Sequence, residues 1–189
     1  MNDMEANMEI EYKFWAGDVT KQQFQAILES HIGRQYEPMY VCSCDDYYTN
    51  QSEDSFLRYR KGGTKTELTL KQKRDGNVVR KEINLDMTPN EDSSVVEFLT
   101  LSGYETAFSV FKEAWIWHFD DCDVSYYTLS DGRSVVELEA VEYSSTEEGV
   151  SIIDDWSHAL ACRKLQKESR SLFEIFTEEA KECCQNSCH

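Results

Sequence analysis

The chain has 189 residues, of which 40% are hydrophobic and 12% aromatic, a composition that excludes a disordered chain. We expect one domain over residues 1–189, with a helical tail from about residue 146. The formal net charge of −17 argues against a nucleic-acid duplex as partner, because phosphate backbones bind clustered Lys and Arg. No apolar run of about eighteen residues and no signal-peptide pattern is present, so we expect a cytoplasmic protein with no membrane partner.

Eight segments show the alternation of apolar and polar residues that is typical of strands. They are expected at residues 8–15, about 39–48, 55–61, 66–73, 77–85, 107–118, 122–130 and 133–142. Two of the intervening turns contain Asp-Gly, at Asp75-Gly76 and Asp131-Gly132. Because Asp-Gly is a strong signal for a short hairpin, we expect antiparallel pairing.

Helical periodicity separates and follows these strands. Residues 20–31 place apolar side chains on one face, and residues 89–102 begin after Thr88 as N-cap and stop at Gly103. Residues 146–184 are expected to form two further helices. We expect the helices to pack on the outside of the sheet.

One face of the expected strands is charged. In the first strand, the period of two puts Glu9, Glu11 and Lys13 on one face and Ile10 and Tyr12 on the other. The same alternation recurs downstream. The residues expected to share the charged face are Glu9, Glu11, Lys13, Arg58, Arg60, Lys71, Lys73, Arg80, Glu82, Lys112, Arg133, Glu137 and Glu139.

Two layouts satisfy this alternation. In a sheet with one solvated face, the charges would face water. In a barrel covered by helices, the apolar residues would face outward and the charges would line the lumen. The charged set contains eight basic and five acidic residues. Because unpaired positive charge in a cavity is costly, this surplus favours a barrel that binds a polyanion, and the planar fork of Arg suits phosphate oxygens.

Two carboxylate pairs stand at the two ends of this series of strands. Glu9 with Glu11, and Glu137 with Glu139, offer oxygen ligands for Mg²⁺ or Mn²⁺. Those ions favour carboxylates combined with substrate phosphates. A metal-bound polyphosphate is therefore the expected occupant of the lumen.

Six short motifs occur in a fixed order along the chain. They are Glu9-Ile10-Glu11-Tyr12-Lys13, Asp45-Asp46-Tyr47-Tyr48, Leu57-Arg58-Tyr59-Arg60, Thr69-Leu70-Lys71, Arg80-Lys81-Glu82 and Glu137-Leu138-Glu139. In this order they resemble the ExExK, D-x-Y-Y, L-R-x-R, T-x-K, R-x-E and E-x-E strands of the CYTH superfamily, the triphosphate tunnel metalloenzymes. The resemblance runs from residue 8 to about residue 142.

The resemblance implies an α+β fold, in which an eight-stranded antiparallel β-barrel forms a tunnel and helices pack outside it. Basic side chains would hold a triphosphate, and glutamates would hold one or two divalent cations, Mg²⁺ or Mn²⁺. The implied catalytic residues are Glu9, Glu11 and Lys13. The implied phosphate ligands are Arg58, Arg60, Lys71, Lys73, Arg80, Lys112 and Arg133. The implied metal ligands are Glu9, Glu11, Glu137 and Glu139, and the other implied lining residues are Glu82 and Tyr127.

Members of this superfamily include inorganic and thiamine triphosphatases and class IV adenylyl cyclases. The resemblance therefore implies metal-dependent binding and hydrolysis of an inorganic, nucleoside or other organic triphosphate. Two alternatives stay open, namely conversion of ATP to cyclic AMP and a non-catalytic module that binds a nucleotide or cyclic nucleotide. The chain departs from the pattern where Lys112-Glu113-Ala114 replaces K-x-R on the sixth strand, and where Ser125 or Tyr127 stands near the place of an inward Asp on the seventh. These departures affect catalysis more than binding.

Overall fold

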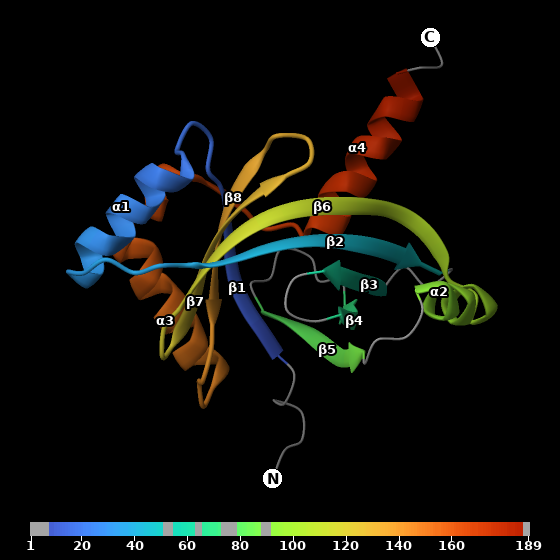
Figure 1. Cartoon of the computed structure of the whole chain (residues 1–189), viewed down its shortest axis with the longest axis horizontal. Helices are drawn as coiled ribbons and strands as arrows, with labels where there is room; N and C mark the ends of the chain where they lie inside the picture. Colours follow the sequence, from blue (N-terminus) through green and yellow to red (C-terminus); the bar gives the residue numbers. More distant parts are fainter. Residues whose placement is uncertain (1–7, 51–54, 63–65, 73–78, 88–91, 187–189) are drawn as a thin grey trace.

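The computed structural model describes residues 8–50, 55–62, 66–72, 79–87 and 92–186. Eight antiparallel strands close into a barrel, and a short ninth strand lies beside it (Figure 1). The strands are β1 (Met8–Trp15), β2 (Met39–Thr49), β3 (Ser55–Gly62), β4 (Thr66–Gln72), β5 (Val79–Met87), β6 (Glu105–His118), β7 (Cys122–Leu129), β8 (Ser134–Ala140) and β9 (Gln166–Glu168). All eight predicted strands are confirmed, with bounds that shift by a few residues.

Four helices accompany the barrel, as predicted. They are α1 (Lys21–Ile32), α2 (Asp92–Leu101), α3 (Thr146–Ala159) and α4 (Leu172–Asn186). Helix α1 begins after Thr20, whose side chain and Gln23 form a capping box, and it ends at Gly33 in the left-handed conformation. The N-cap predicted at Thr88 lies outside the described residues. In the part of the chain that the structure describes, no helix is both long enough and apolar enough to span a membrane.

The strand order around the barrel is β5-β4-β3-β2-β6-β7-β8-β1. The ring closes where β1 pairs with the start of β5, so that Glu9 lies opposite Arg80. On its other side β1 pairs with β8, which places Glu11 opposite Glu139 and Lys13 opposite Glu137. This register brings the two predicted carboxylate pairs, which are more than 120 residues apart in the sequence, onto neighbouring strands.

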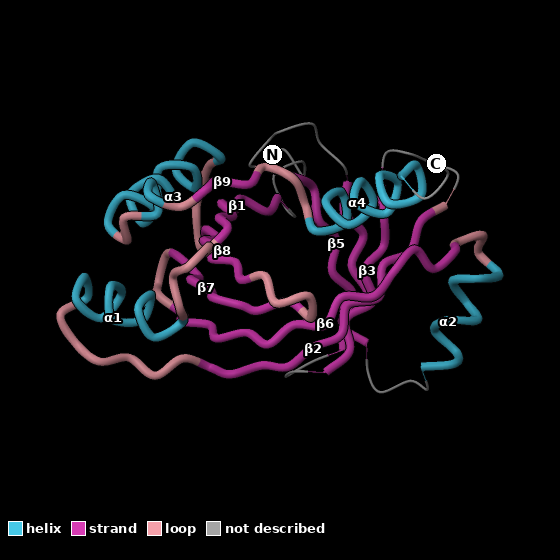
Figure 2. Tube along the Cα trace, turned by 90° about the horizontal axis from the view of Figure 1, so that it is seen from above, coloured by secondary structure: helices cyan, strands magenta, loops and turns pink. Residues whose placement is uncertain are grey.

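The barrel, and not a sheet with one solvated face, is the layout that the chain adopts. Outward-facing Ile10 and Leu138 share one buried cluster with Phe24 of α1 and Ile153 of α3. On the opposite side of the barrel, α2 packs on the outer face of β3 and β4 (Figure 2). Apolar side chains therefore cover the outside of the barrel, and the alternating charged side chains point inward.

Helix α4 differs from the other helices because its first turn reaches one end of the barrel. Phe173 stacks on Phe56 of β3, with ring centroids 4.4 Å apart, and also contacts Tyr47 of β2 and Phe108 of β6. All four rings belong to one cluster, of which Tyr47, Phe56 and Phe173 are buried. Since Tyr47 and Phe56 line the interior, α4 closes this end of the barrel.

Candidate functional site

The barrel encloses a cavity of about 430 Å³, which lies within the usual size range of small-molecule sites. Each of the eight barrel strands contributes to its lining, as does the first turn of α4. The structure brings together twelve of the predicted site residues there, namely Glu9, Glu11, Lys13, Arg58, Arg60, Lys71, Arg80, Glu82, Lys112, Tyr127, Glu137 and Glu139. Their roles as ligands and catalysts stay predictions, but their convergence in one cavity is a property of the fold.

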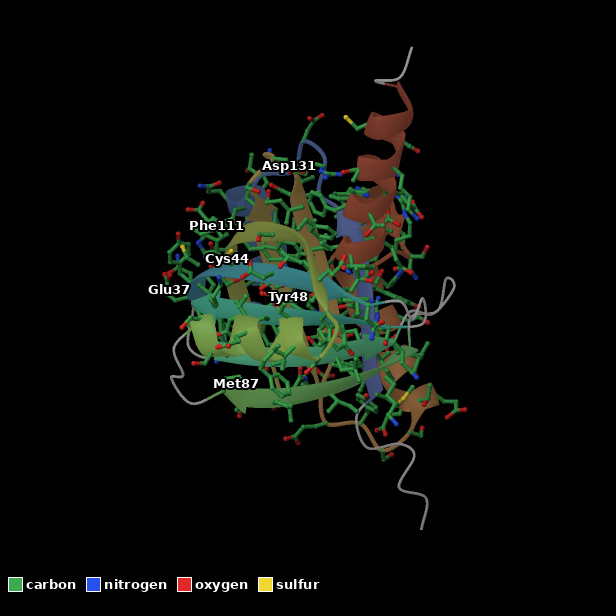
Figure 3. The ribbon with its side chains drawn as sticks, turned by 90° about the vertical axis from the view of Figure 1, so that its right-hand side faces the viewer. Glu37, Cys44, Tyr48, Met87, Phe111 and Asp131 are labelled. Carbon is green, nitrogen blue, oxygen red and sulfur yellow. The ribbon has the colours of Figure 1, made fainter. Side chains whose placement is uncertain are left out.

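Two predicted phosphate ligands are not part of this group. Lys73 lies outside the described residues. Arg133 lies in the turn before β8, where its guanidinium pairs with Asp131 at 2.5 Å and with Glu179 of α4 at 2.6 Å. Figure 3 places Asp131 at the end of the molecule from which α4 projects. The strand begins only at Ser134, so strand alternation does not direct Arg133 into the lumen, and the expectation that it shares the charged inner face is wrong.

The predicted surplus of positive charge in the lumen is also wrong. The described cavity lining contains six Lys and Arg residues, together with Glu67 and Asp123 in addition to the predicted carboxylates. Asp45, which is fully buried, pairs with two of the basic residues. The interior of the described barrel is therefore a set of ion pairs. Glu67 could have been found, because the period of two places it on the same face as Lys71.

The carboxylate side of the cavity is formed by β1, β5 and β8. Lys71 Nζ lies 2.8 Å from Glu9 Oε1 and 2.6 Å from Glu82 Oε2. Arg80 Nη2 donates to Glu11 Oε1 at 2.8 Å. On the other side of Glu11, Lys13 Nζ donates to the same oxygen at 3.0 Å. Each basic group therefore bridges carboxylates that would otherwise repel one another.

These pairs leave part of the negative charge uncompensated. Burial, followed by the charges of Glu9, Glu11 and Glu137, raises the pKa of Glu139 well above its ordinary value. Burial and the charge of Glu11 likewise raise the pKa of Glu9 to about 7. In contrast, Lys13 and Arg80 overcome the burial of Glu11 and hold its pKa well below the ordinary value. Additional positive charge beside Glu9 and Glu139 would relieve this repulsion.

The opposite side of the cavity is organised by Asp45. Its two carboxylate oxygens accept from Nε and Nη2 of Arg60, at 2.7 and 2.9 Å, and Oδ2 also lies 2.9 Å from Lys112 Nζ. Burial, with the charges of Arg60 and Arg58 adding to it, lowers the pKa of Lys112 to about 8 although Asp45 opposes the shift. Arg60 and Lys112 thus share the single carboxylate of Asp45, so their two positive charges exceed its one negative charge.

Two guanidinium groups retain unused donors. Arg58 Nη2 donates to Glu67 and to Thr69, both at 3.0 Å, whereas its buried Nε has no hydrogen-bond partner among the described residues. The same holds for Nε of Arg80, which lies 3.5 Å from Glu9 without a hydrogen bond. A buried donor without an acceptor costs about 1–3 kcal/mol. Both arginines border the cavity and can donate further bonds to an anionic ligand.

The donor set also fits a divalent cation, although it is not preassembled. Within the described ranges, no three His, Cys, Asp or Glu side chains are already placed to hold a metal ion. The carboxylates of Glu9, Glu11, Glu137 and Glu139 nevertheless lie on adjacent strands, and the charges of neighbouring carboxylates add to burial in raising the pKa of Glu9 and of Glu139. Oxygen ligands of this kind suit Mg²⁺ or Mn²⁺ when substrate phosphates complete the coordination.

The cavity opens at the end opposite α4. At the α4 end, Tyr47, Phe56 and Phe173 are buried. At the other end His118 lies at the tip of β6 with its side chain 53% exposed, and its Nδ1 is 2.8 Å from Asp123 Oδ1. Half-buried apolar side chains from the start of β2 and the end of β6 line the same mouth. These residues were not predicted to belong to the site, although strand alternation on β2 and β6 places them on its inner face.

Comparison with known proteins supports the fold. The chain superimposes on the PH1012 protein of Pyrococcus horikoshii OT3 with a TM-score of 0.73 and 22% identity, covering 88% of this chain and 98% of that one. For the PH1819 protein of the same organism the TM-score is 0.71 and the identity 17%, over 90% and 99% of the two chains. A proposed adenylate cyclase from Vibrio parahaemolyticus gives a TM-score of 0.67 and 16% identity, over 90% and 98%.

No protein-family model and no curated protein sequence matches the chain. Identities of 16–22% therefore establish a shared architecture only. The closed antiparallel barrel of this chain agrees with these structural matches. The chain therefore shares the barrel fold of these solved structures.

Proposed function

We propose that the protein binds a triphosphate together with Mg²⁺ or Mn²⁺ inside the barrel and hydrolyses its terminal phosphate. The observation that carries this proposal is the division of the cavity into two sides. Arg58, Arg60 and Lys112 are gathered on one side, and Glu9, Glu11 and their neighbours on β8 form the other. A triphosphate with a bound cation presents the complementary charges in one small molecule.

The ion pairs within the cavity predict that the cation and the triphosphate bind cooperatively. A cation alone would have to displace Lys71 and Arg80 from Glu9 and Glu11, which would leave Arg80 without its carboxylate partners and Lys71 with Glu82 alone. A triphosphate alone would draw Lys71 and Arg80 away from Glu9 and Glu11, and would leave these buried carboxylates without their basic partners. When both bind, each group exchanges one partner of opposite charge for another, so the desolvation cost is compensated.

The proposed roles follow from position. Arg58, Arg60 and Lys112 would hold the phosphate oxygens, joined by Lys71 and Arg80 when the cation takes their place beside Glu9 and Glu11. Together they would align the terminal phosphorus with a water molecule, whose oxygen bonds to phosphorus as the bond to the leaving diphosphate breaks. Glu9 and Glu11 would hold the cation with the two glutamates of β8, and Lys13, which contacts Glu11, would position them. A bound Mg²⁺ or Mn²⁺ would neutralise phosphate charge and polarise a phosphoryl oxygen.

Two further candidate functions each have an observation in their favour. A binding module without turnover is favoured by Ala114, which stands where the resemblance predicts an Arg, and by Asp45, which already occupies Arg60 and Lys112. Formation of cyclic AMP from ATP is favoured by the shared fold with the proposed adenylate cyclase of Vibrio parahaemolyticus. Both candidates use the same triphosphate-binding side of the cavity.

A turnover screen separates the three functions. Inorganic triphosphate and ATP are each incubated with Mg²⁺ or Mn²⁺, and orthophosphate, pyrophosphate and cyclic AMP are measured. We expect orthophosphate. Pyrophosphate with cyclic AMP would replace the hydrolase by a cyclase, and tight binding without any product would leave the binding module.

A matched pair of arginine variants tests the location of the site. Arg58→Ala should weaken triphosphate binding by about 1.5–3 kcal/mol, the range for hydrogen bonds to charged groups. Arg133→Ala should leave binding unchanged, because Arg133 is engaged with Asp131 and Glu179 outside the cavity. Arg58→Lys keeps the positive charge beside Glu67 and should therefore fold like the parent. It loses the planar fork of the guanidinium, so it should also bind triphosphate more weakly than the parent. Equal binding by Arg58→Ala and the parent would place the triphosphate elsewhere.

A further inference from the structure

The inner face of β2 and β6 changes in character from the open end to the closed end. Along this pair of strands the inward residues are paired in register, in the order Met39 with Ile116, Val41 with Ala114, Ser43 with Lys112, Asp45 with Val110, and Tyr47 with Phe108. The pairs at the open end are apolar, those in the middle carry the basic side of the cavity, and those at the closed end pack against α4. The cavity is therefore built in three layers.

The apolar layer at the open end consists of Met39, Val41, Ala114 and Ile116, which we call the collar. All four side chains are half-buried, and Met39, Val41 and Ile116 line the cavity. Phosphate oxygens gain nothing from apolar neighbours, because they need hydrogen-bond donors and positive charge. The collar thus has no role in binding an inorganic triphosphate, although it lies one layer outward from Lys112.

A polar group, His118, lies at the edge of the collar, where it can orient a ligand by a hydrogen bond. His118 lies two residues beyond Ile116 on the same face of β6, and its Nδ1 is bonded to Asp123. Because an ionised carboxylate only accepts hydrogen bonds, Nδ1 of His118 donates to Asp123, which leaves Nε2 for a further hydrogen bond. Apolar walls with one polar group at the rim are typical of sites for flat organic molecules.

We propose that the collar binds the organic group of a triphosphate ester, so that the preferred ligand is a nucleoside triphosphate and not inorganic triphosphate. This inference rests on the proposed function, because the phosphates would occupy the charged layer next to Lys112. The ester enters through the open end, where the base contacts the collar and forms a hydrogen bond with Nε2 of His118. Ala114 is the smallest side chain of the collar and lies opposite Val41, so a larger side chain there would narrow the collar.

The test compares two ligands that differ only in the organic group. Calorimetry with Mn²⁺ measures the affinities of the non-hydrolysable imido analogues of ATP and of inorganic triphosphate. The parent should bind the ATP analogue at least about tenfold more tightly, the discrimination expected for an apolar pocket. Ile116→Ser and Ala114→Arg should each remove most of this preference, the first by deleting an apolar wall and the second by narrowing the collar, while Ile116→Ser binds the inorganic analogue like the parent.

Tyr40→Ser is the matched control. Tyr40 neighbours Met39 on β2 but points outward and is 53% exposed, so this variant should keep the preference of the parent. Equal affinity of the parent for the two analogues would overturn the inference and leave the proposed triphosphate site intact, as would a loss of preference in Tyr40→Ser equal to that in Ile116→Ser. Failure of the parent to bind either analogue would overturn the proposed function itself.

Discussion

Glu9 is a buried carboxylate whose like-charged neighbours add to the cost of its burial. Its side chain is 9% exposed and contacts Lys71, but Glu11 and Glu82 also lie nearby. Burial and these like charges raise its pKa to about 7, from an ordinary value of 4.5. A group with this shift makes the stability of the folded protein depend on pH in a direction that can be worked out.

Between pH 4.5 and 7 the folded protein retains a proton on Glu9 that the unfolded chain has released, so the free energy of unfolding should fall as the pH rises through this window. A shift of this size corresponds to at most about 3 kcal/mol. The pKa of Glu11 is lowered by folding, so Glu11 changes the free energy of unfolding only below pH 4.5. It does not contribute to the pH dependence within this window. Urea unfolding at pH 5 and pH 7 should therefore show a smaller loss for Glu9→Gln than for the parent. Equal losses would contradict the assignment.

Single residues of the site were predictable from sequence to the extent that strand alternation decides where they point. Glu11, Arg58 and Lys71 lie inside as predicted, because each belongs to a regular strand with one apolar face. Arg133 does not, because it belongs to a turn. The buried partners of the basic residues, such as Asp45, depend on which strands become neighbours, and no local pattern contains that information.

Among the secondary-structure elements, α4 has the largest effect on the shape of the cavity. Its first turn inserts Phe173 among Tyr47, Phe56 and Phe108, which closes one end of the barrel. The alternative, an open tunnel, would expose these rings to water. We infer that apolar burial, and not hydrogen bonding, holds α4 in place.

Phe173→Ala should lower the free energy of unfolding by about 3–5 kcal/mol, since it empties a well-packed aromatic cluster. Phe98→Ala on α2 is the control, because Phe98 is 64% exposed and its removal should change stability by less than about 0.5 kcal/mol. Chemical denaturation measures both. Similar small effects for the two variants would mean that α4 is not packed into the barrel end.

The helices and strands themselves were the most predictable level. Eight alternating segments and the turns between them predicted the strands of the barrel. The apolar periodicity of residues 20–31 predicted α1, whereas its capping box at Thr20 was seen only in the structure. The closure of the ring was not readable from any single segment, because it depends on three residue pairs between β1 and β5. The resemblance of the ordered motifs to a known superfamily supplied that closure.

At the scale of the whole molecule, the chain combines a formal net charge of −17 with an interior that is largely paired within itself. The surface repels polyanions, whereas the cavity offers arginine and lysine groups that can change partners. If the proposed function holds, the protein should select a triphosphate that carries a cation, because a bare polyanion is repelled by the surface and would leave the carboxylates of the cavity without their basic partners. Cation and triphosphate should therefore promote each other's binding to the same extent, since such coupling is reciprocal.

Calorimetric titration of the non-hydrolysable inorganic triphosphate analogue, with and without Mn²⁺, tests this central claim most directly. The parent should bind the analogue at least about tenfold more tightly with the metal, which corresponds to a coupling of about 1.4 kcal/mol. Mn²⁺ also binds the free analogue in solution, and this effect is the same for every protein variant. The double variant Glu9→Gln with Glu11→Gln should therefore lose most of the gain in affinity if the gain comes from a metal bound in the cavity. Metal-independent affinity in the parent, or an equal gain in the parent and the double variant, would contradict the account.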